Sequence, residues 1–229
     1  MTNLDDNNNN AKVGWSGKDW TLLGANALLF IVLFLVFNHQ LPDQMASHYN
    51  INGEQDRMMA KWSFWLLYAA TGIALPSILT ATRFVDPRKN NYSRFEGYFY
   101  LIRWAVSLFL HAVMLLIILD NAGYKLPTIN IVVGGIGVLW MILGNRMGQV
   151  RSNFFIGIRT PWALMDEQNW RLTHRLGARV WFAAGLIMFV SAWFVSSFWI
   201  AAVILVSALG SALIPAVYSY MLYRRASNG

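Results

Sequence analysis

The segment at residues 153–164 has the most specific arrangement of side chains in the chain. It reads Asn153-Phe-Phe-Ile-Gly157-Ile-Arg159-Thr160-Pro161-Trp162-Ala-Leu. Thr160 followed by Pro161 predicts a helix start, because threonine caps well and proline suits the first helical position. Gly157 permits a tight bend just before it. The Arg159 guanidinium could hold a lipid phosphate or a carboxylate through two hydrogen bonds. Two interpretations are equally supported. The segment is either such an anion-binding site or simply a stretch that returns to the membrane surface and is anchored there by Trp162 and Arg159.

The next residues, 166–181, have helical periodicity. Asp166 is a reasonable N-cap, and Arg171, Arg175 and Arg179 recur every four residues as one basic stripe. A third face carries Trp170, His174 and Trp181. The pattern predicts an amphipathic helix lying in the cytoplasmic interface and attracting anionic lipids. The less favoured interpretation is a docking surface for a cytoplasmic partner.

A polar loop, residues 38–61, contains a second group of candidates. Pro42, His48, Gly53 and Asp56 lie in it, and Asn52-Gly53 is a typical hairpin turn. The spacing of His48, Glu54 and Asp56 is not diagnostic of a metal site. We expect a compact extracytoplasmic loop that could meet a ligand, and no metal.

Two ionisable residues, Arg103 and His111, fall inside an apolar stretch. They are eight positions apart and so share a helix face. Intramembrane charges often mark function, but Arg103 could snorkel to the surface and His111 could bond a neighbouring helix. We favour the interpretation that both residues stabilise the structure and do not form a functional site. The expected spans contain no Asp or Glu, and the chain has no catalytic set or cofactor motif, so we expect no enzyme and no cofactor.

The composition indicates which solvent surrounds these candidates. Hydrophobic residues make up 56% of the 229 residues and charged residues 13%, against about 25% charged in soluble proteins. The mean hydropathy is +0.40. The net charge of +7 has a simpler cause than nucleic-acid binding, namely Lys and Arg kept on the cytoplasmic side of a membrane. No direct nucleic-acid binding is therefore expected.

The apolar stretches predict an all-α polytopic bundle of about six transmembrane helices, plus the cytoplasmic interfacial amphipathic helix. A span needs about 20 apolar residues, so the long run at 180–223 must fold back, with Ser196-Ser197 as its turn. A kink is expected at Pro76 and a bend at Pro215. The expected units are a disordered cytoplasmic tail at 1–19, a helix hairpin at 20–82, a second at 98–144, a cytoplasmic segment at 145–178 and a last hairpin at 179–223.

Small residues in two spans predict close helix contacts, because they let backbones approach in lipid. They are Gly134, Gly135 and Gly137 in the fourth span and Ser207, Gly210 and Ser211 in the last.

Six spans place both termini on one side together with most of the basic residues. That side would carry Lys12, Lys18, Arg83, Arg88, Lys89, Arg94, Arg146, Arg151, Arg159, Arg171, Arg175, Arg179, Arg224 and Arg225. The other side would carry Arg57, Lys61 and Lys125. This asymmetry predicts a membrane protein with cytoplasmic N- and C-termini.

The segment 153–164, with Trp170 and Thr173-His174-Arg175-x-Gly177 after it, resembles the signature of the SdpI family. Gly144-Asn145-x-Met147 also fits that pattern, whereas Ala163 replaces the usual threonine. The loop from Pro42 to Lys61 is similar to a small domain of unknown function that often precedes the signature. The resemblance covers nearly the whole chain beyond the tail.

The resemblance implies a protein of the bacterial plasma membrane that makes the producing bacterium immune to a secreted antimicrobial peptide toxin. It also implies signalling, in which a cytoplasmic autorepressor is sequestered at the membrane. The signature site carried over by position is Asn145, Asn153, Gly157, Arg159, Thr160, Pro161, Trp162, Trp170, His174 and Arg175. The alternative is a transporter or lipid-handling protein in which Arg103, His111 and Arg159 line a path for an anionic substrate.

Overall fold

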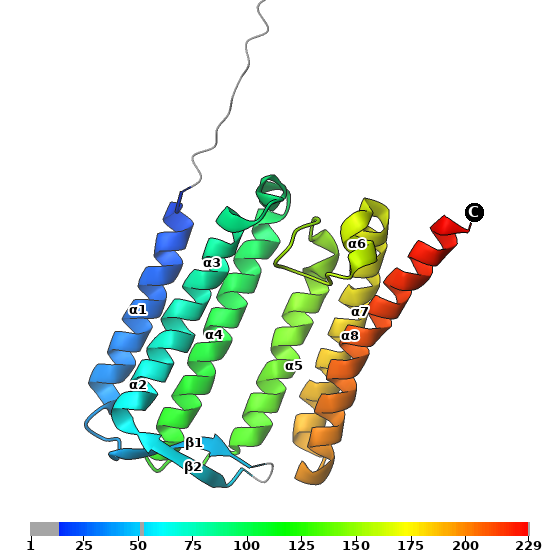
Figure 1. The fold of residues 1–229 in the computed structure, drawn as a ribbon. Coiled ribbons are helices and arrows are strands. Elements are labelled where there is room, and N and C mark those ends of the chain that lie inside the picture. Colours follow the sequence, from blue (N-terminus) through cyan, green and yellow to red (C-terminus); the bar gives the residue numbers. More distant parts are fainter. Residues whose placement is uncertain (1–13, 51–52, 229) are drawn as a thin grey trace, which may run out of the picture.

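The fold is known from a computed structural model, which describes residues 14–50 and 53–228. Within those ranges, six helices are long and apolar enough to cross a membrane. They stand side by side, with α1 at one edge and the pair α7–α8 at the other (Figure 1). The predicted all-α polytopic membrane bundle is confirmed.

The elements run in chain order as follows: α1 Gly17–Phe37, β1 Gln44–Tyr49, β2 Gln55–Ala60, α2 Lys61–Ala69, the π-helical turn η1 Ala70–Ala74, α3 Leu75–Val85, the 3₁₀ helix η2 Lys89–Phe95, α4 Glu96–Asn121, α5 Thr128–Arg146, the 3₁₀ turn η3 Met147–Gln149, α6 Pro161–Met165, α7 Glu167–Phe194 and α8 Ser197–Ser227.

Helix α1 begins inside the segment predicted to be a disordered tail. The Asp19 carboxylate accepts hydrogen bonds from the backbone N–H (2.6 Å) and the hydroxyl (2.7 Å) of Ser16, a capping arrangement that starts the helix at Gly17. Asp19 is buried, so the prediction that the spans contain no acidic residue is wrong. Residues 1–13 of the expected tail lie outside the described part of the chain.

The second span is one continuous rod built from α2, η1 and α3. The irregularity expected at Pro76 takes the form of a π-helical turn directly before it, closed by a hydrogen bond from Leu75 N–H to the Ala70 carbonyl. Such turns relieve a helix that proline interrupts. Gly72 lies in this turn, and a Cβ there would be 2.8 Å from the Tyr68 ring and 3.0 Å from the His111 ring. The turn therefore brings the backbone against His111 of α4.

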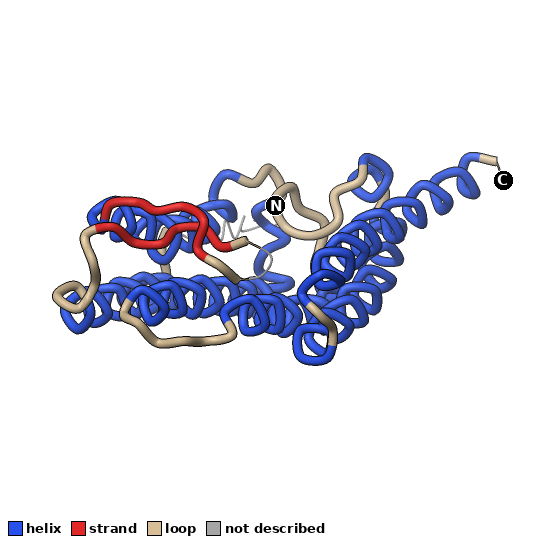
Figure 2. Tube along the Cα trace, turned by 90° about the horizontal axis from the view of Figure 1, so that it is seen from below, coloured by secondary structure: helices blue, strands red, loops and turns tan. Residues whose placement is uncertain are grey.

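The first loop holds an antiparallel hairpin, β1–β2, which the helix-only prediction lacked. It lies across the ends of the helices on the α1–α4 side of the bundle (Figures 1 and 2). Asp120, near the end of α4, accepts hydrogen bonds from the Tyr49 hydroxyl (2.8 Å) and the Gln55 amide (2.7 Å). Burial is the largest cause that raises the pKa of the Tyr49 phenol, and the contact with Asp120 is the next. The phenol therefore stays protonated and donates its hydrogen bond. The hairpin is thereby fixed to α4.

Helix α7 runs unbroken from Glu167 to Phe194, so the predicted interfacial helix is not a separate element. The predicted basic stripe forms the first part of this helix, and its residues Arg171, Arg175 and Arg179 are exposed. The face with Trp170 and His174 is fully buried. No proline separates the amphipathic pattern from the apolar one, and a lone glycine such as Gly177 is tolerated inside a helix, so the two continue as one helix.

Glycine packing joins α5 to α7, as expected. A Cβ at Gly137 would be 2.6 Å from the Gly185 carbonyl oxygen, and one at Gly144 would be 2.7 Å from the Phe182 nitrogen. Backbones this close require glycine, so the prediction is confirmed for Gly137. Gly134 and Gly135 instead face aromatic rings, those of Trp193 and Phe109. The turn predicted at Ser196-Ser197 is also confirmed, since α7 ends at Phe194 and α8 begins at Ser197.

Candidate functional site

The signature loop, residues 150–160, is held from inside by the side chain of Asn153. The Asn153 amide oxygen accepts from the backbone N–H groups of Phe155 (2.9 Å) and Ile156 (2.6 Å), and its nitrogen donates to the carbonyls of Arg151 and Ile156. Asn153 is fully buried. One amide side chain thus satisfies four backbone groups of an irregular loop that would otherwise lack partners.

Gly157 and His174 make the contact on which the loop rests. Gly157 has φ +103°, and a Cβ at that position would lie 2.3 Å from His174 Nε2. The next residue, Ile158, donates its backbone N–H to that same Nε2 atom (3.0 Å), while His174 Nδ1 lies 2.8 Å from the Trp170 carbonyl. Nε2 must therefore be the acceptor and Nδ1 the protonated nitrogen, which assigns a neutral ring.

Trp170 completes this support beneath the loop. Its ring stacks on that of His174 at 4.1 Å between centroids, and its Nε1 donates to the Val150 carbonyl at 2.8 Å. Both side chains are buried. Residues four apart on α7 thus hold the two ends of the signature loop, Val150 and Ile158.

The connection between α3 and α4 binds the loop from the side opposite α7. The buried Asp86 carboxylate accepts from the Phe154 N–H (2.9 Å) and the Tyr92 hydroxyl (3.0 Å). Arg88 donates to the Ser152 hydroxyl and to the Leu164 carbonyl. The two halves of the bundle therefore meet at this loop through charge-assisted hydrogen bonds.

A polar cluster joins α6, α7 and α8 behind the loop. Thr160 caps α6 by accepting from the Ala163 N–H (3.1 Å), with Pro161 in the first turn as predicted. The Thr160 and Ser219 hydroxyls are 2.6 Å apart, and Ser219 donates to the Asn169 amide oxygen at 2.7 Å. Trp162 packs its ring against Tyr220, with the centroids 4.9 Å apart. The signature thus also fixes the last part of α8.

Next to this cluster lies an amphipathic cleft of about 560 Å³. Trp162, Leu172 and Tyr223 give it apolar walls, and Asp166 and Arg225 give it charges of both signs. It lies at the same end of the bundle as the signature loop.

Five predicted signature residues are exposed, three of them with polar side chains: Asn145, Arg159 and Arg175, besides Gly157 and Pro161. Arg159 donates to the Phe154 carbonyl at 2.8 Å, and Arg175 projects from α7 beside Gly148. The site is therefore a rigid, hydrogen-bonded scaffold that presents free guanidinium edges to solvent or lipid headgroups. Such an arrangement can bind anionic groups. No cluster of His, Asp and Glu suited to a metal occurs in the described ranges.

The hairpin brings some of its predicted residues together. His48 Nδ1 and Asp56 Oδ1 are 2.6 Å apart across the two strands, on the exposed face. Gly53 forms the turn with φ +82°, while Pro42 is exposed ahead of β1. Asn52, the other half of the expected turn signal, lies outside the described residues.

Arg103 belongs to a buried ionic cluster among α1, α3 and α4. It donates to one oxygen of Asp19, and Arg83 donates to the other. Asp19 and Arg103 are 1% and 2% exposed, so Arg103 does not snorkel to the surface. The cluster has two guanidinium groups and one carboxylate, and the Nε atoms of both arginines lack partners within the described residues.

His111 lies further along the same helix, in a second polar group. Its Nδ1 is 2.7 Å from the Tyr68 hydroxyl, and its Nε2 is 3.3 Å from the Asn26 amide oxygen. Ser107 donates to that same oxygen at 2.5 Å. These contacts match the interhelical hydrogen bond expected for His111. Arg159 belongs to neither group, so the residues proposed for an anion path do not form one network.

Sequence reasoning missed Asp19, Asn26 and Asp86. Each is a single polar residue at the edge of an apolar run or within one, and only the tertiary fold gives it a partner. The available signal was Ser16 three residues before Asp19, the spacing of a capping pair.

The fold and the site define a polytopic α-helical membrane protein with a β-hairpin at one end of the bundle and a conformationally fixed signature loop at the opposite end. Residues 149–219 match the SdpI/YfhL protein family. Residues 25–72 match DUF1648, a domain of unknown function. The predicted resemblance to the SdpI family is thereby confirmed, and both matches fall on the segments that suggested it.

A curated relative shows the same resemblance. The chain is 32% identical over 119 residues to the "Immunity protein SdpI" of Bacillus subtilis (strain 168). That alignment covers 52% of this chain and 56% of the relative, so the chain spans little more than half of the relative's length. No solved structure matches the chain.

Proposed function

We propose that the protein is a membrane immunity protein that protects the producing bacterium against a secreted antimicrobial peptide toxin. The observation that carries the proposal is the similarity to the immunity protein SdpI. The separate match of residues 149–219 to the SdpI/YfhL protein family supports it. The proposed role is non-enzymatic. The buried signature side chains Asn153, Trp170 and His174 hold the loop backbone, and the exposed guanidinium groups suit the binding of anionic groups.

The toxin is met at the outer side, by the hairpin or the outer ends of the helices. A message reaches the inner side only if the toxin favours one arrangement of the bundle over another. The contacts from Asp86 and Arg88 to the signature loop join the α1–α4 half to the α5–α8 half. A change in the tilt of α4 would therefore act on the loop through η2.

The inner surface is the proposed place for signalling. Arg159, Arg171 and Arg175 are exposed there, and their charge suits anionic lipids or an acidic surface on a cytoplasmic autorepressor. This part of the proposal depends on the immunity role.

The orientation of the chain gives the first prediction. With both termini cytoplasmic, the hairpin faces outward and the signature faces inward. Because the chain has no cysteine, Glu54→Cys should react with a membrane-impermeant maleimide on intact cells, and Arg175→Cys should react only after lysis. The reverse labelling pattern would overturn the orientation.

The immunity role itself is tested in a cell that the related peptide toxin kills. Expression of the wild-type chain should restore growth, whereas the empty vector should not. Leu108→Ala, a change on a lipid-exposed face, is the matched control and should protect as well as the wild type. Failure to protect against the toxin, with the protein present in the membrane at wild-type amounts, would exclude immunity.

A further inference from the structure

The cleft beside the signature loop carries two charges of opposite sign that the protein leaves available. Asp166, between α6 and α7, and Arg225, near the end of α8, both line it and are exposed. Within the described residues they form no ion pair with each other. One oxygen of Asp166 caps α7 by accepting from the Asn169 N–H. The other oxygen and the Arg225 guanidinium have no partner in that part of the chain, so the cleft offers a ligand one acceptor and one donor.

Aromatic and aliphatic side chains form the rest of the cleft. Trp162 and Tyr223 contribute rings whose centroids are 6.3 Å apart, and ring faces of this kind attract ammonium groups. Leu172 and Leu222 add aliphatic surface. The volume of about 560 Å³ is that of ordinary ligand pockets, about 300–1,000 Å³. The cleft therefore suits a ligand with a cation, an anion and an apolar part.

The cleft lies at the level of lipid headgroups. Tyr223 is about 39 Å along α8 from Ser197, at 1.5 Å per residue. The hydrocarbon core of a bilayer is about 30 Å thick, and the headgroups bring the total to about 40–45 Å. With the start of α8 at one membrane surface, Tyr223 falls among the headgroups of the opposite leaflet, where Trp and Tyr are enriched.

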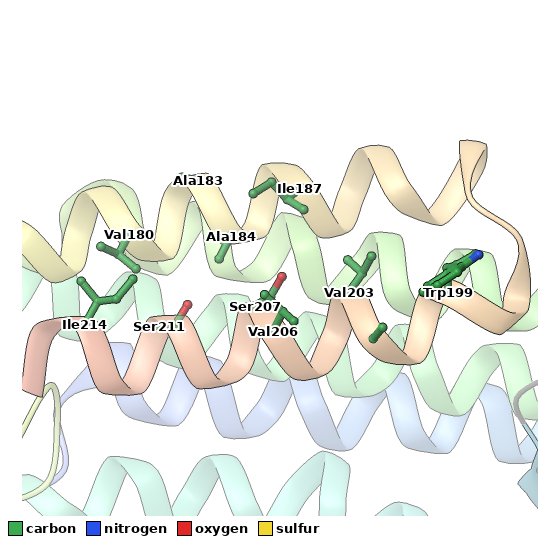
Figure 3. Close-up of a pocket in the computed structure, with 12 residues that line it drawn as sticks. Val180, Ala183, Ala184, Ile187, Trp199, Val203, Val206, Ser207, Ser211 and Ile214 are labelled. Atoms are coloured by element: carbon green, nitrogen blue, oxygen red, sulfur yellow. The ribbon is translucent and has the colours of Figure 1, made fainter.

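An apolar track leads from the cleft into the hydrocarbon. Leu172, Leu176 and Val180 are one helical turn apart on α7, and each lines one of three successive hollows beside α8. The last hollow is a groove of about 530 Å³ without charged lining residues, with Val180 and Ile214 at one end (Figure 3). Gly210, expected to bring helices together, lines this groove instead. A Cβ there would meet only the Ile214 side chain of its own helix.

We propose that the cleft binds the headgroup of phosphatidylethanolamine, a phospholipid that carries a phosphate and a primary ammonium group. Arg225 donates hydrogen bonds to the phosphate oxygens. Asp166 accepts from the ammonium group, which the rings of Trp162 and Tyr223 also attract. An acyl chain passes over Leu172 and continues along the track between α7 and α8.

Related ligands satisfy only part of the cleft. Phosphatidylglycerol has a phosphate for Arg225 but brings no cation to Asp166. Phosphatidylcholine has a cation, but its quaternary nitrogen has no N–H to donate to Asp166. Soluble phosphoethanolamine has both charges and lacks an apolar part for Leu172 and Leu222. Only the ethanolamine lipid matches the donor, the acceptor and the apolar walls together.

Native mass spectrometry of the purified protein tests the proposal. The protein, in a mild detergent, is mixed with equal amounts of phosphatidylethanolamine, phosphatidylcholine and phosphatidylglycerol that have identical acyl chains. Phosphatidylethanolamine should bind about threefold to fivefold more than phosphatidylcholine, the size of effect that one accessible charged contact supplies. An excess of soluble phosphoethanolamine should not displace it. Equal binding of these two lipids would overturn the proposal.

Charge-removing variants assign the binding to this cleft. Asp166→Asn keeps a good helix cap and should lower phosphatidylethanolamine binding about threefold to fivefold without lowering phosphatidylglycerol binding. Arg225→Gln should lower the binding of both lipids. A cleft that had only lost its shape would bind less of both after Asp166→Asn, which would contradict the assigned role of the carboxylate.

Two neighbouring positions supply matched controls. Glu167→Gln and Arg224→Gln remove the same charges from exposed residues that do not line the cleft. Both should bind phosphatidylethanolamine as the wild type does. The proposal fails if the controls lose as much of this lipid as Asp166→Asn and Arg225→Gln, or if those two variants lose none.

Discussion

Replacement of Asp19 by alanine should lower the free energy of unfolding by about 3–5 kcal/mol, the usual cost of removing one member of a buried ion pair. The carboxylate is the acceptor for both Arg83 and Arg103. Its loss leaves two guanidinium groups facing each other inside the bundle without a counter-charge. Arg103→Leu should cost less, because Asp19 then still pairs with Arg83 and one positive charge is removed.

The measurement is unfolding of the purified protein in mixed micelles with increasing sodium dodecyl sulfate. Glu96→Ala is the matched control, because Glu96 forms an ion pair with Lys18 in which both side chains are more than half exposed. Such a pair contributes about 0–1 kcal/mol. If Asp19→Ala were as stable as Glu96→Ala, the buried cluster would not hold α1 to α3 and α4.

The number and order of the spans could be predicted from the sequence, because lipid requires about 20 apolar residues in each and leaves few alternatives. The cap at Thr160, the close approach at Gly137 and the turn before α8 followed from local chemistry in the same way. Each of these depends on residues adjacent in sequence or on a single small side chain.

The contacts that build the site could not be predicted, because they join segments far apart in the chain. Asp86 bonds Phe154 across 68 residues, and Arg103 bonds Asp19 across 84. The sequence contains the hairpin turn signal Asn52-Gly53, but the two strands were missed because they, such as Gln55–Ala60, lack the alternation of a half-buried sheet. Hydrophobic periodicity reports which face is buried and not which polar group meets it.

Replacement of Gly157 by alanine should abolish protection against the toxin while the protein still inserts in the membrane. The position has φ +103°, and strain of this kind costs about 1–3 kcal/mol for a residue with a Cβ. The added methyl would also fall 2.3 Å from His174 Nε2, so the loop must move and break the bond from Ile158. Losing that buried hydrogen bond costs about 1–3 kcal/mol more.

Different contacts stabilise the signature loop and the membrane-spanning helices. Measuring both therefore distinguishes a local effect on the loop from unfolding of the whole protein. Gly157→Ala leaves the α5–α7 glycine contacts and the Asp19 cluster intact, so the loop should open locally and release the strain while the spans stay folded. The unfolding transition in sodium dodecyl sulfate should therefore move less than for Asp19→Ala. Proteolysis of inverted membranes should instead cut the chain within residues 150–160 faster than in the wild type.

Gly148→Ala is the matched control, because its Cβ would meet Arg175 at an ordinary 3.7 Å. It should keep both protection and protease resistance. Full protection by Gly157→Ala would mean that the fixed loop conformation is not needed for immunity, and the signature loop would then serve another purpose.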